Sequence, residues 1–215
     1  MTVFNSPGMG TYGSLWQAHG YSGSGDVACL INSATGRPAV VCGSAAGVFE
    51  KLEFVRRKFA DDDLLIFGVN DVGMYLPRMD HWVSLHGANL AAWKNVRWLH
   101  HRGPEDVRYH CIDSKDEADF HWELLNPLFA LSGYFAMQIA WIMGCKPIIL
   151  VGCPGQSVRR FFEADARPDF GYGLGTSGSD LGIRQQLIAE MNRLPEFKKV
   201  VKGTTGWTRE FFGSL

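Results

Sequence analysis

The chain has almost no net charge of either sign. Lysine and arginine total 21 and aspartate and glutamate 22, which gives a formal charge of -1. Proteins that hold nucleic acid through its phosphates usually carry a basic excess, because phosphate neutralisation supplies most of their affinity. The balanced charge therefore gives no strong nucleic-acid signal, and it leaves room only for a local basic patch.

The sequence also lacks paired cysteines and long apolar runs. Its five cysteines are scattered, with no CxxC pair and no cysteine–histidine grouping of zinc-site spacing. No run approaches the ~20 apolar residues of a membrane span, and the first residues have no basic region followed by an apolar one. We therefore expect reduced thiols and a soluble, cytoplasmic protein without a membrane span.

What the chain does have is enough apolar material for one large domain. Hydrophobic residues make up 46% of its 215 residues and aromatic residues 13%, which is ample for a buried core. Residues 1–37 contain the breaker clusters GYSGSGD and NSATGRP, so they predict little regular structure beyond a short element at DVACLI. We interpret 1–37 as an N-terminal arm or partial cap and 38–215 as the main domain.

Apolar runs alternate with helical patterns after residue 37. The runs at 39–42, 64–69 and 146–152 have no polar alternation, as expected for parallel strands covered on both faces. Further strands are expected at 81–85, 96–101, 107–112 and 198–203, and helices at 48–59, 132–144 and 181–194. The helix at 132–144 is expected to have Ser132 as its N-cap and to end at Gly144. The pattern predicts the α/β class, with a single Rossmann-like domain whose mostly parallel sheet has helices on both faces.

Small and polar residues directly follow the predicted strands. In open parallel sheets, ligands bind beyond the carboxyl ends of the strands, where helix N-termini and loop amides favour anions. The long loop at 152–180 also carries arginines that would neutralise phosphate. The candidate binding residues are Gly43, Ser44, Asn70, Ser132, Gly133, Gly152, Cys153, Arg159 and Arg160, and the candidate catalytic residues are His86 and Asp71.

Most of these candidates also have a purely structural interpretation. The turn GSAAG at 43–47 lacks a lysine and the full GxGxxG spacing, so a tight turn without a ligand explains it equally well. Asn70 is compatible with an Asx turn that caps the next helix, and Ser132 with ordinary capping. His86 is a candidate general base, although a lone histidine is more often structural. The histidines and carboxylates between residues 100 and 123 have no HxxxH or HExxH spacing, so no metal site is predicted.

The order of five motifs resembles a known family. AVVCGSAAG, LLIFGVNDV, HWVSLH, LSGYFAMQIAWIMGCKPIILVG and VVKGTTGW are similar to the ordered motifs of a sialyltransferase-like Rossmann variant, over roughly residues 38 to 210. That family includes bacterial lipooligosaccharide sialyltransferases, motility-associated flagellin-modifying proteins and archaeal 6-hydroxymethylpterin diphosphokinases. The chain looks most similar to its phage-encoded members, which would place it in the host cytoplasm.

The resemblance implies roles for several candidates. Gly43 and Ser44 would face the phosphates of a nucleotide-activated donor, Asn70 would bind the nucleotide, and Ser132 with Gly133 would hold phosphate or ribose. The motifs depart from the family in two places: the first turn reads Gly43-Ser44-Ala45 where the family usually has Gly-Pro-Ser, and the late strand ends in Gly152-Cys153-Pro154 where the family usually has Gly-x-Asp. The family's sialyltransferases draw a histidine base from the loop at 153–180, which contains no histidine here. His86 or Asp71 would then be the base.

Three functions follow from this resemblance. The first is a glycosyltransferase-like enzyme that transfers a group from a nucleotide-activated donor to an acceptor hydroxyl, with no cofactor firmly implied. The second is diphosphokinase-like pyrophosphoryl transfer, which would require Mg²⁺. The third is a non-catalytic nucleotide-binding protein or phage structural or accessory protein. All three take a small nucleotide-type ligand, and all allow a homo-oligomer.

Overall fold

A single sheet organises the chain. The computed structural model describes residues 21–23, 25–99, 106–112, 118–124, 131–155, 161 and 177–215. Within these residues the sheet has the strand order β1-β6-β5-β4-β3-β2-β7-β8. The strands are β1 (Tyr21–Gly23), β2 (Ala39–Cys42), β3 (Leu65–Val69), β4 (His81–Val83), β5 (Arg108–Cys111), β6 (Phe120–Leu124), β7 (Ile148–Val151) and β8 (Val201–Gly203).

The sheet is parallel from β6 to β8, and β1 alone is antiparallel, beside β6. After the edge strand β1, the chain enters the central strand β2 and moves outward through β3, β4, β5 and β6, then returns to the other side of β2 for β7 and β8. Such a doubly wound order confirms the predicted Rossmann-like α/β fold. The strand order changes direction between β2 and β7, which is where open sheets of this type form their ligand crevice.

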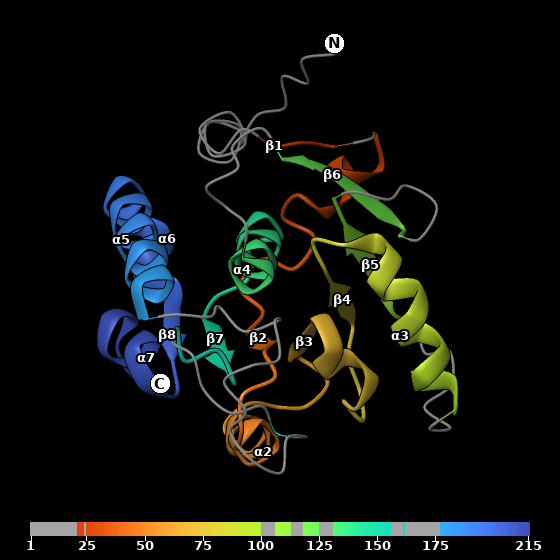
Figure 1. Ribbon diagram of the computed structural model, residues 1–215, viewed down its shortest axis with the longest axis horizontal. Helices are drawn as coiled ribbons and strands as arrows, with labels where there is room; N and C mark the ends of the chain where they lie inside the picture. Colours follow the sequence, from red (N-terminus) through yellow and green to blue (C-terminus); the bar gives the residue numbers. More distant parts are fainter. Residues whose placement is uncertain are drawn as a thin grey trace.

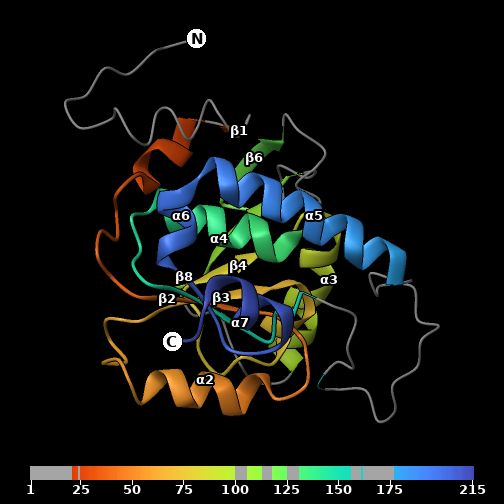
Figure 2. The same cartoon turned by 90° about the vertical axis from the view of Figure 1, so that its left-hand side faces the viewer.

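Helices cover both faces of the sheet (Figures 1 and 2). Figure 2 shows α2 below the sheet and α4, α5 and α6 above it. One core lies between the sheet and α4 with its neighbours, and a second lies between the sheet and the α2, α3 and η2 elements. The helices are η1 (Gly25–Leu30), α2 (Val48–Arg56), η2 (Asn70–Met74), α3 (Gly87–Leu99), α4 (Ser132–Ile142), α5 (Ser177–Arg193), α6 (Pro195–Val200) and α7 (Gly206–Phe212).

The central helix α4 is almost wholly inside the protein. Every residue in it except Gly133 and Trp141 is buried, which explains why its sequence is apolar on all sides. Ser132 is its first helical residue; the N-cap position belongs to Leu131, and no side chain caps the helix. The predicted Ser132 cap is therefore one residue too late. After the helix ends, Gly144 adopts a left-handed φ of 82°, as expected for a helix-terminating glycine.

The segment before β2 packs against α4. Val27, Leu30 and Ala34 belong to the same core as the helix, and backbone bonds run from Asn32 and Ala34 to the carbonyls of Ile142 and Met143. η1 occupies the place of the predicted DVACLI element. Within the described residues, this part of the N-terminal segment therefore contributes to the core and to the sheet.

One predicted strand is wrong, and another is predicted too long. Residues 96–99 belong to α3, not to a strand, because parallel strands β4 and β5 need a crossover between them, which α3 supplies. Residues 198–200 form the end of the short helix α6, and only Val201–Gly203 form β8.

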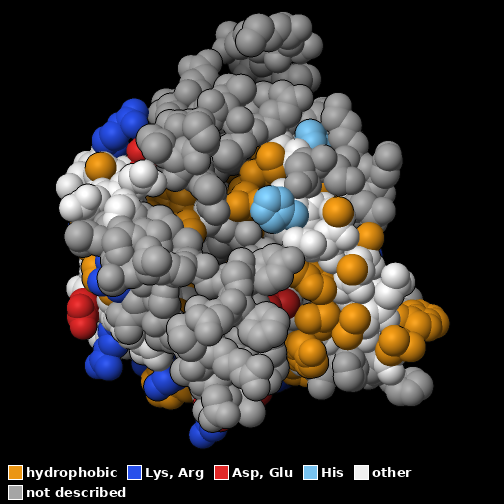
Figure 3. All heavy atoms as spheres, in the orientation of Figure 1, with side chains coloured by type: hydrophobic (Ala, Val, Ile, Leu, Met, Phe, Trp, Pro, Cys, Tyr) orange, Lys and Arg blue, Asp and Glu red, His pale blue; other side chains and the backbone are white. Residues whose placement is uncertain are grey.

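Apolar side chains gather over α3 in Figure 3. Two residues at the end of this helix, Trp98 and Leu99, are 65% and 75% exposed.

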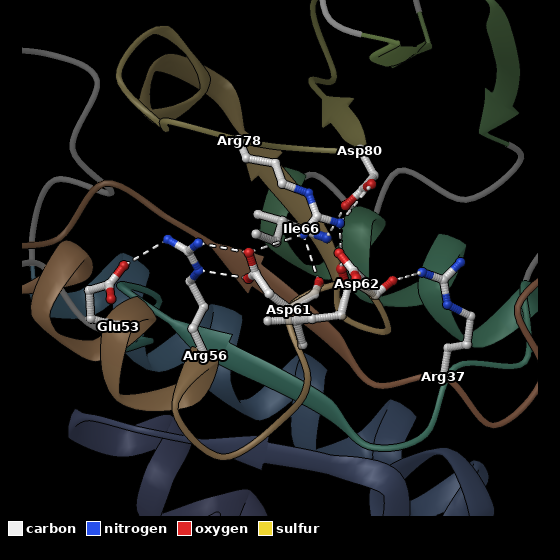
Figure 4. Close-up of polar contacts among 9 residues, drawn as sticks. Arg37, Glu53, Arg56, Asp61, Asp62, Ile66, Arg78 and Asp80 are labelled. Carbon is white, nitrogen blue, oxygen red and sulfur yellow. Dashed lines mark hydrogen bonds and ion pairs between the residues drawn. The ribbon is translucent and has the colours of Figure 1, made fainter.

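The acidic run at 61–63 is held by arginines at the amino ends of the strands (Figure 4). Arg56 makes two bonds of 2.7 and 2.8 Å to the Asp61 carboxylate, and Arg78 donates to the Asp61 carbonyl at 2.6 Å. The hydrogen bonds from Arg56 hold the pKa of Asp61 below its usual range. Arg37 binds the carbonyls of Asp62 and Asp63. This run therefore fixes the connection between α2 and β3, at the edge opposite the predicted ligand site.

A buried histidine pair links three neighbouring strands. His81 on β4 and His110 on β5 are 3% and 0% exposed, and His81 Nδ1 lies 2.8 Å from His110 Nε2. The indole N–H of Trp122 on β6 donates to His110 Nδ1 at 3.2 Å. Because an indole N–H can only donate, His110 carries its proton on Nε2 and donates it to His81. Burial lowers the pKa of His81 to about 3 and that of His110 well below its usual value, so both rings are neutral at pH 7.

Candidate functional site

The carboxyl ends of the parallel strands bring most of the predicted site residues to one edge. Gly43 and Ser44 follow β2, Asn70 and Asp71 follow β3, and Gly152 and Cys153 follow β7. His86 lies three residues after β4. Neighbouring strands are ~5 Å apart, so Asn70, at the end of β3, lies one strand spacing from the end of β2. His86, after β4, lies about two strand spacings from the end of β2, or about 10 Å. The edge therefore brings these residues into a row that extends from the β2–β7 reversal to the end of β4.

Two buried glycines form the floor of this reversal. A methyl group added at Gly43 would lie 2.5 Å from the Gly152 carbonyl oxygen and 2.7 Å from Cys153 Sγ. The Gly43 N–H donates to the Val151 carbonyl at 2.8 Å, so it extends the β2–β7 ladder by one bond. In this structure, the absence of side chains at Gly43 and Gly152 allows the two chain segments to pass in contact.

Cys153 lies between the strand ends and the central helix. Cys153 as a residue is half-buried; its Sγ lies 3.8 Å from the Val41 carbonyl oxygen, and a methyl group at Gly133 would be 3.8 Å from the same sulfur. Burial raises the pKa of Cys153 to about 12. The thiol therefore stays protonated at neutral pH, which makes it a packing group and not an activated nucleophile.

The amino end of α4 reaches the reversal through this contact. The first backbone N–H groups of a helix have no partner within the helix and, together with its dipole, they attract anions. Ser132 and Gly133 supply two of them, and no acidic residue occurs in the first turn. The helix α2 also begins at this edge, directly after β2. It carries Glu50 in its first turn, and the negative charge of Glu50 repels a phosphate. Of the two helices that begin near β2 and β7, α4 is therefore better suited to bind one.

Asn70 adopts a left-handed backbone, with a φ of 55°, directly after β3. Asparagine tolerates this region better than most residues, and the turn is fixed because the Trp82 indole donates to the Asn70 carbonyl at 2.7 Å. The conformation places the half-buried Asn70 side chain at the edge next to β2. Asp71 lies inside the protein and is only 7% exposed, so it is poorly placed to meet an acceptor from solvent.

His86 is exposed in the turn that leads from β4 to α3. The Ser84 hydroxyl holds this turn, because it accepts from the His86 N–H at 3.1 Å and donates to the His86 carbonyl at 3.2 Å. The backbone is thus fixed while the imidazole is accessible. Of the two catalytic candidates, His86 has the exposure that a general base needs.

The arginines predicted to close the site, Arg159 and Arg160, lie outside the described residues. A cation that the sequence analysis missed is Arg184, on α5. It donates to the Gly155 carbonyl at 2.7 Å and lies 5.6 Å from the Trp207 ring centre. This contact ties the loop after β7 to α5 and α7. No motif indicated it, because an arginine in an amphipathic helix usually faces solvent.

The described part of the chain contains no group of three or more His, Cys, Asp or Glu side chains placed to hold a metal ion, and none of its described helices is long and apolar enough to span a membrane. Comparison with family models, curated proteins and solved structures gives no match. The fold and the edge thus define a Rossmann-like α/β protein with a candidate anion site at the reversal, and the resemblance to the sialyltransferase-like family stays a prediction.

Proposed function

We propose that this protein binds a phosphorylated, nucleotide-type donor across the carboxyl edge of its sheet and transfers the activated group to an acceptor hydroxyl, as glycosyltransferase-like enzymes do. One observation carries the proposal: the strand order reverses between β2 and β7, and the amino end of the buried helix α4 lies at that point. Open α/β sheets bind nucleotides at such reversals.

Four residues at the edge have a part in this proposal. The N–H groups at Ser132 and Gly133 hold the donor phosphate, and Asn70 binds the nucleotide beside them. The acceptor oxygen forms a bond to the donor carbon while the bond from that carbon to the phosphate oxygen breaks. The nucleotide leaves with the electron pair, and the proton of the acceptor hydroxyl moves to the imidazole of His86. The dipole of α4 stabilises the charge that develops on the leaving phosphate.

Thermal unfolding with a ligand panel tests the binding step. A ligand at 100 times its dissociation constant stabilises the folded state by about 2.7 kcal/mol, which raises the Tm of a domain this size by roughly 5–10 °C. We expect this rise with a nucleotide-sugar or its nucleotide, without added Mg²⁺. A rise only with a triphosphate and Mg²⁺ would support pyrophosphoryl transfer instead, and no rise with any nucleotide would contradict the proposal.

The same samples test the transfer step. With a donor that raises the Tm, slow release of free nucleotide is expected, and His86→Gln should lower that rate by about 10²- to 10⁴-fold, the usual contribution of a general base. The Tm rise should survive this substitution, because His86 lies about two strand spacings from the phosphate site. Binding without any release of nucleotide would favour the non-catalytic alternative.

A further inference from the structure

A pocket lined by lysines lies at the β8 end of the sheet, where α5, α6, β8 and α7 meet (Figure 2). Its volume is ≈ 370 Å³, within the usual range for small-molecule sites. Three apolar residues and three lysines make up most of its lining, and they are Met191, Pro195, Phe212, Lys198, Lys199 and Lys202. None of the residues placed at the β2–β7 reversal lines it, so the pocket is separate from the proposed donor site.

The floor of the pocket is apolar and belongs to the core. Met191 is 0% exposed and Phe212 is 5% exposed, and both pack in the core that contains α4. The Gly203 N–H donates to the Gly213 carbonyl at 3.0 Å, which ties the end of α7, next to Phe212, to β8. The fold therefore sets this floor without the help of a ligand.

The lysines come from two elements that follow each other in the chain. Lys198 and Lys199 lie in the last turn of α6, and Lys202 lies on β8. Lys199 is exposed and pairs with Glu196. Lys198 and Lys202 are half-buried, and the Nζ of Lys198 lies 4.0 Å from the ring centre of Phe211.

Two of these positive charges have no carboxylate beside them. Within the described part of the chain, neither Lys198 nor Lys202 forms an ion pair, and none of the described lining residues is acidic. Lysine stems cover apolar surface while their ammonium groups stay at its border with water. The pocket therefore combines an apolar floor with two cations that an anion can neutralise.

We propose that this pocket binds a small organic phosphomonoester whose apolar part is about as large as one aromatic ring. Such a phosphate carries a charge of about −1.5 to −2 at pH 7, which matches the ammonium groups of Lys198 and Lys202. The apolar part of the ligand covers Met191 and Phe212. A hollow of this size suits a small molecule better than a flat charged surface such as a membrane.

Calorimetry with phenyl phosphate, inorganic phosphate and benzyl alcohol tests both halves of this ligand on the whole protein. Phenyl phosphate should bind at least about tenfold more tightly than inorganic phosphate, because burial of one ring usually contributes that much or more. Benzyl alcohol has the ring without the charge and should bind more weakly than phenyl phosphate. Equal binding of phenyl phosphate and inorganic phosphate would overturn the proposal.

Substitution of the lysines places the binding in the pocket. Lys198→Gln and Lys202→Gln should each weaken phenyl phosphate binding a few-fold, the usual contribution of an ion pair near the surface, and the double variant should weaken it about tenfold. Lys202→Arg keeps the charge and should retain binding. Lys51→Gln is the matched control, since Lys51 is an exposed lysine on α2, outside the pocket. Unchanged binding by the double variant would overturn the proposal.

A variant of the other site separates this proposal from the donor site. Gly133→Asp places a negative charge at the amino end of α4, so it should weaken nucleotide binding and leave phenyl phosphate binding in the pocket unchanged. Loss of phenyl phosphate binding in Gly133→Asp alone would assign that binding to α4 and refute the pocket. Loss in the double lysine variant alone would support the pocket, whether or not any nucleotide binds. Binding of phosphatidylglycerol vesicles but not of phenyl phosphate would assign the lysines to a membrane surface and also overturn the proposal.

Discussion

Replacing Gly43 with alanine is expected to lower the free energy of unfolding by about 3 kcal/mol, the upper end of what overpacking usually costs. The new methyl group would lie 2.5 Å from the Gly152 carbonyl oxygen. That oxygen belongs to the backbone at the end of β7, so it cannot rotate away as a flexible side chain would. Denaturant unfolding of the two proteins measures the difference.

Gly182→Ala is the control for this prediction. Gly182 lies in α5, and outside its own helix backbone no atom of the described residues lies within 4 Å of an added methyl group; alanine favours a helix by up to about 1 kcal/mol over glycine. We expect Gly182→Ala to be neutral or stabilising. If Gly43→Ala were equally harmless, the contact between the ends of β2 and β7 would not be tight, and the floor described for the site would be wrong.

Acid should destabilise the protein between pH 7 and pH 5. The folded state holds His81 and His110 neutral, whereas the unfolded chain protonates them below its ordinary histidine pKa of about 6.5. The unfolded state thus binds more protons, and stability falls as the pH drops from about 6.5 toward the folded pKa of His81, about 3. His81 alone accounts for about 2 kcal/mol between pH 6.5 and 5, and His110 adds to the loss in the same direction.

Charged groups near His81 and His110 lower the same two pKa values further. The positive charges of Arg108 and Arg37 lower the pKa of His81, and His81 and Arg108 lower that of His110. Denaturant unfolding at several pH values measures the loss. The variants His81→Gln and His110→Gln should be less stable than the wild type at pH 7 but should each show a flatter pH dependence. Equal wild-type stability at pH 7 and pH 5 would mean that the pair is not buried as described.

The sequence predicted the central strands well because they are buried on both faces. AVVC at 39–42 and LLIFGV at 64–69 show uninterrupted apolar runs, and β2 and β3 occupy them within one residue. The end of α3 was predicted as a strand at 96–101 because this segment, taken alone, contains Val96 and Trp98, which favour strands. β6 was missed because FHWEL carries His121 and Glu123, and an acidic segment hides a strand near the edge of a sheet.

The candidate site was predictable where it depends on position alone. Residues that follow parallel strands share an edge in any parallel sheet, so Gly43, Asn70 and Gly152 could be grouped without knowing the strand order. Contacts between distant segments could not be predicted. Nothing local marks Phe161 as a partner of Phe49 and Tyr75, or His81 as a partner of His110, because those contacts depend on the register of the strands and the course of the loop after β7.

The central claim is that a phosphate binds at the amino end of α4, and a charge placed at Gly133 tests it most directly. Among the described residues, a Cβ atom added there meets Cys153 Sγ alone, at an ordinary 3.8 Å, and a carboxylate in the first turn of a helix is compatible with its dipole. Gly133→Asp and its neutral counterpart Gly133→Asn should therefore both fold, with similar Tm values.

Calorimetry with inorganic pyrophosphate and with the best nucleotide of the panel supplies the measurement. The account predicts that Gly133→Asp binds both at least about tenfold more weakly than Gly133→Asn, because like charges a few ångströms apart repel strongly at a partly buried site. Equal binding by the two variants and the wild type would contradict the account and place the phosphate elsewhere on the molecule.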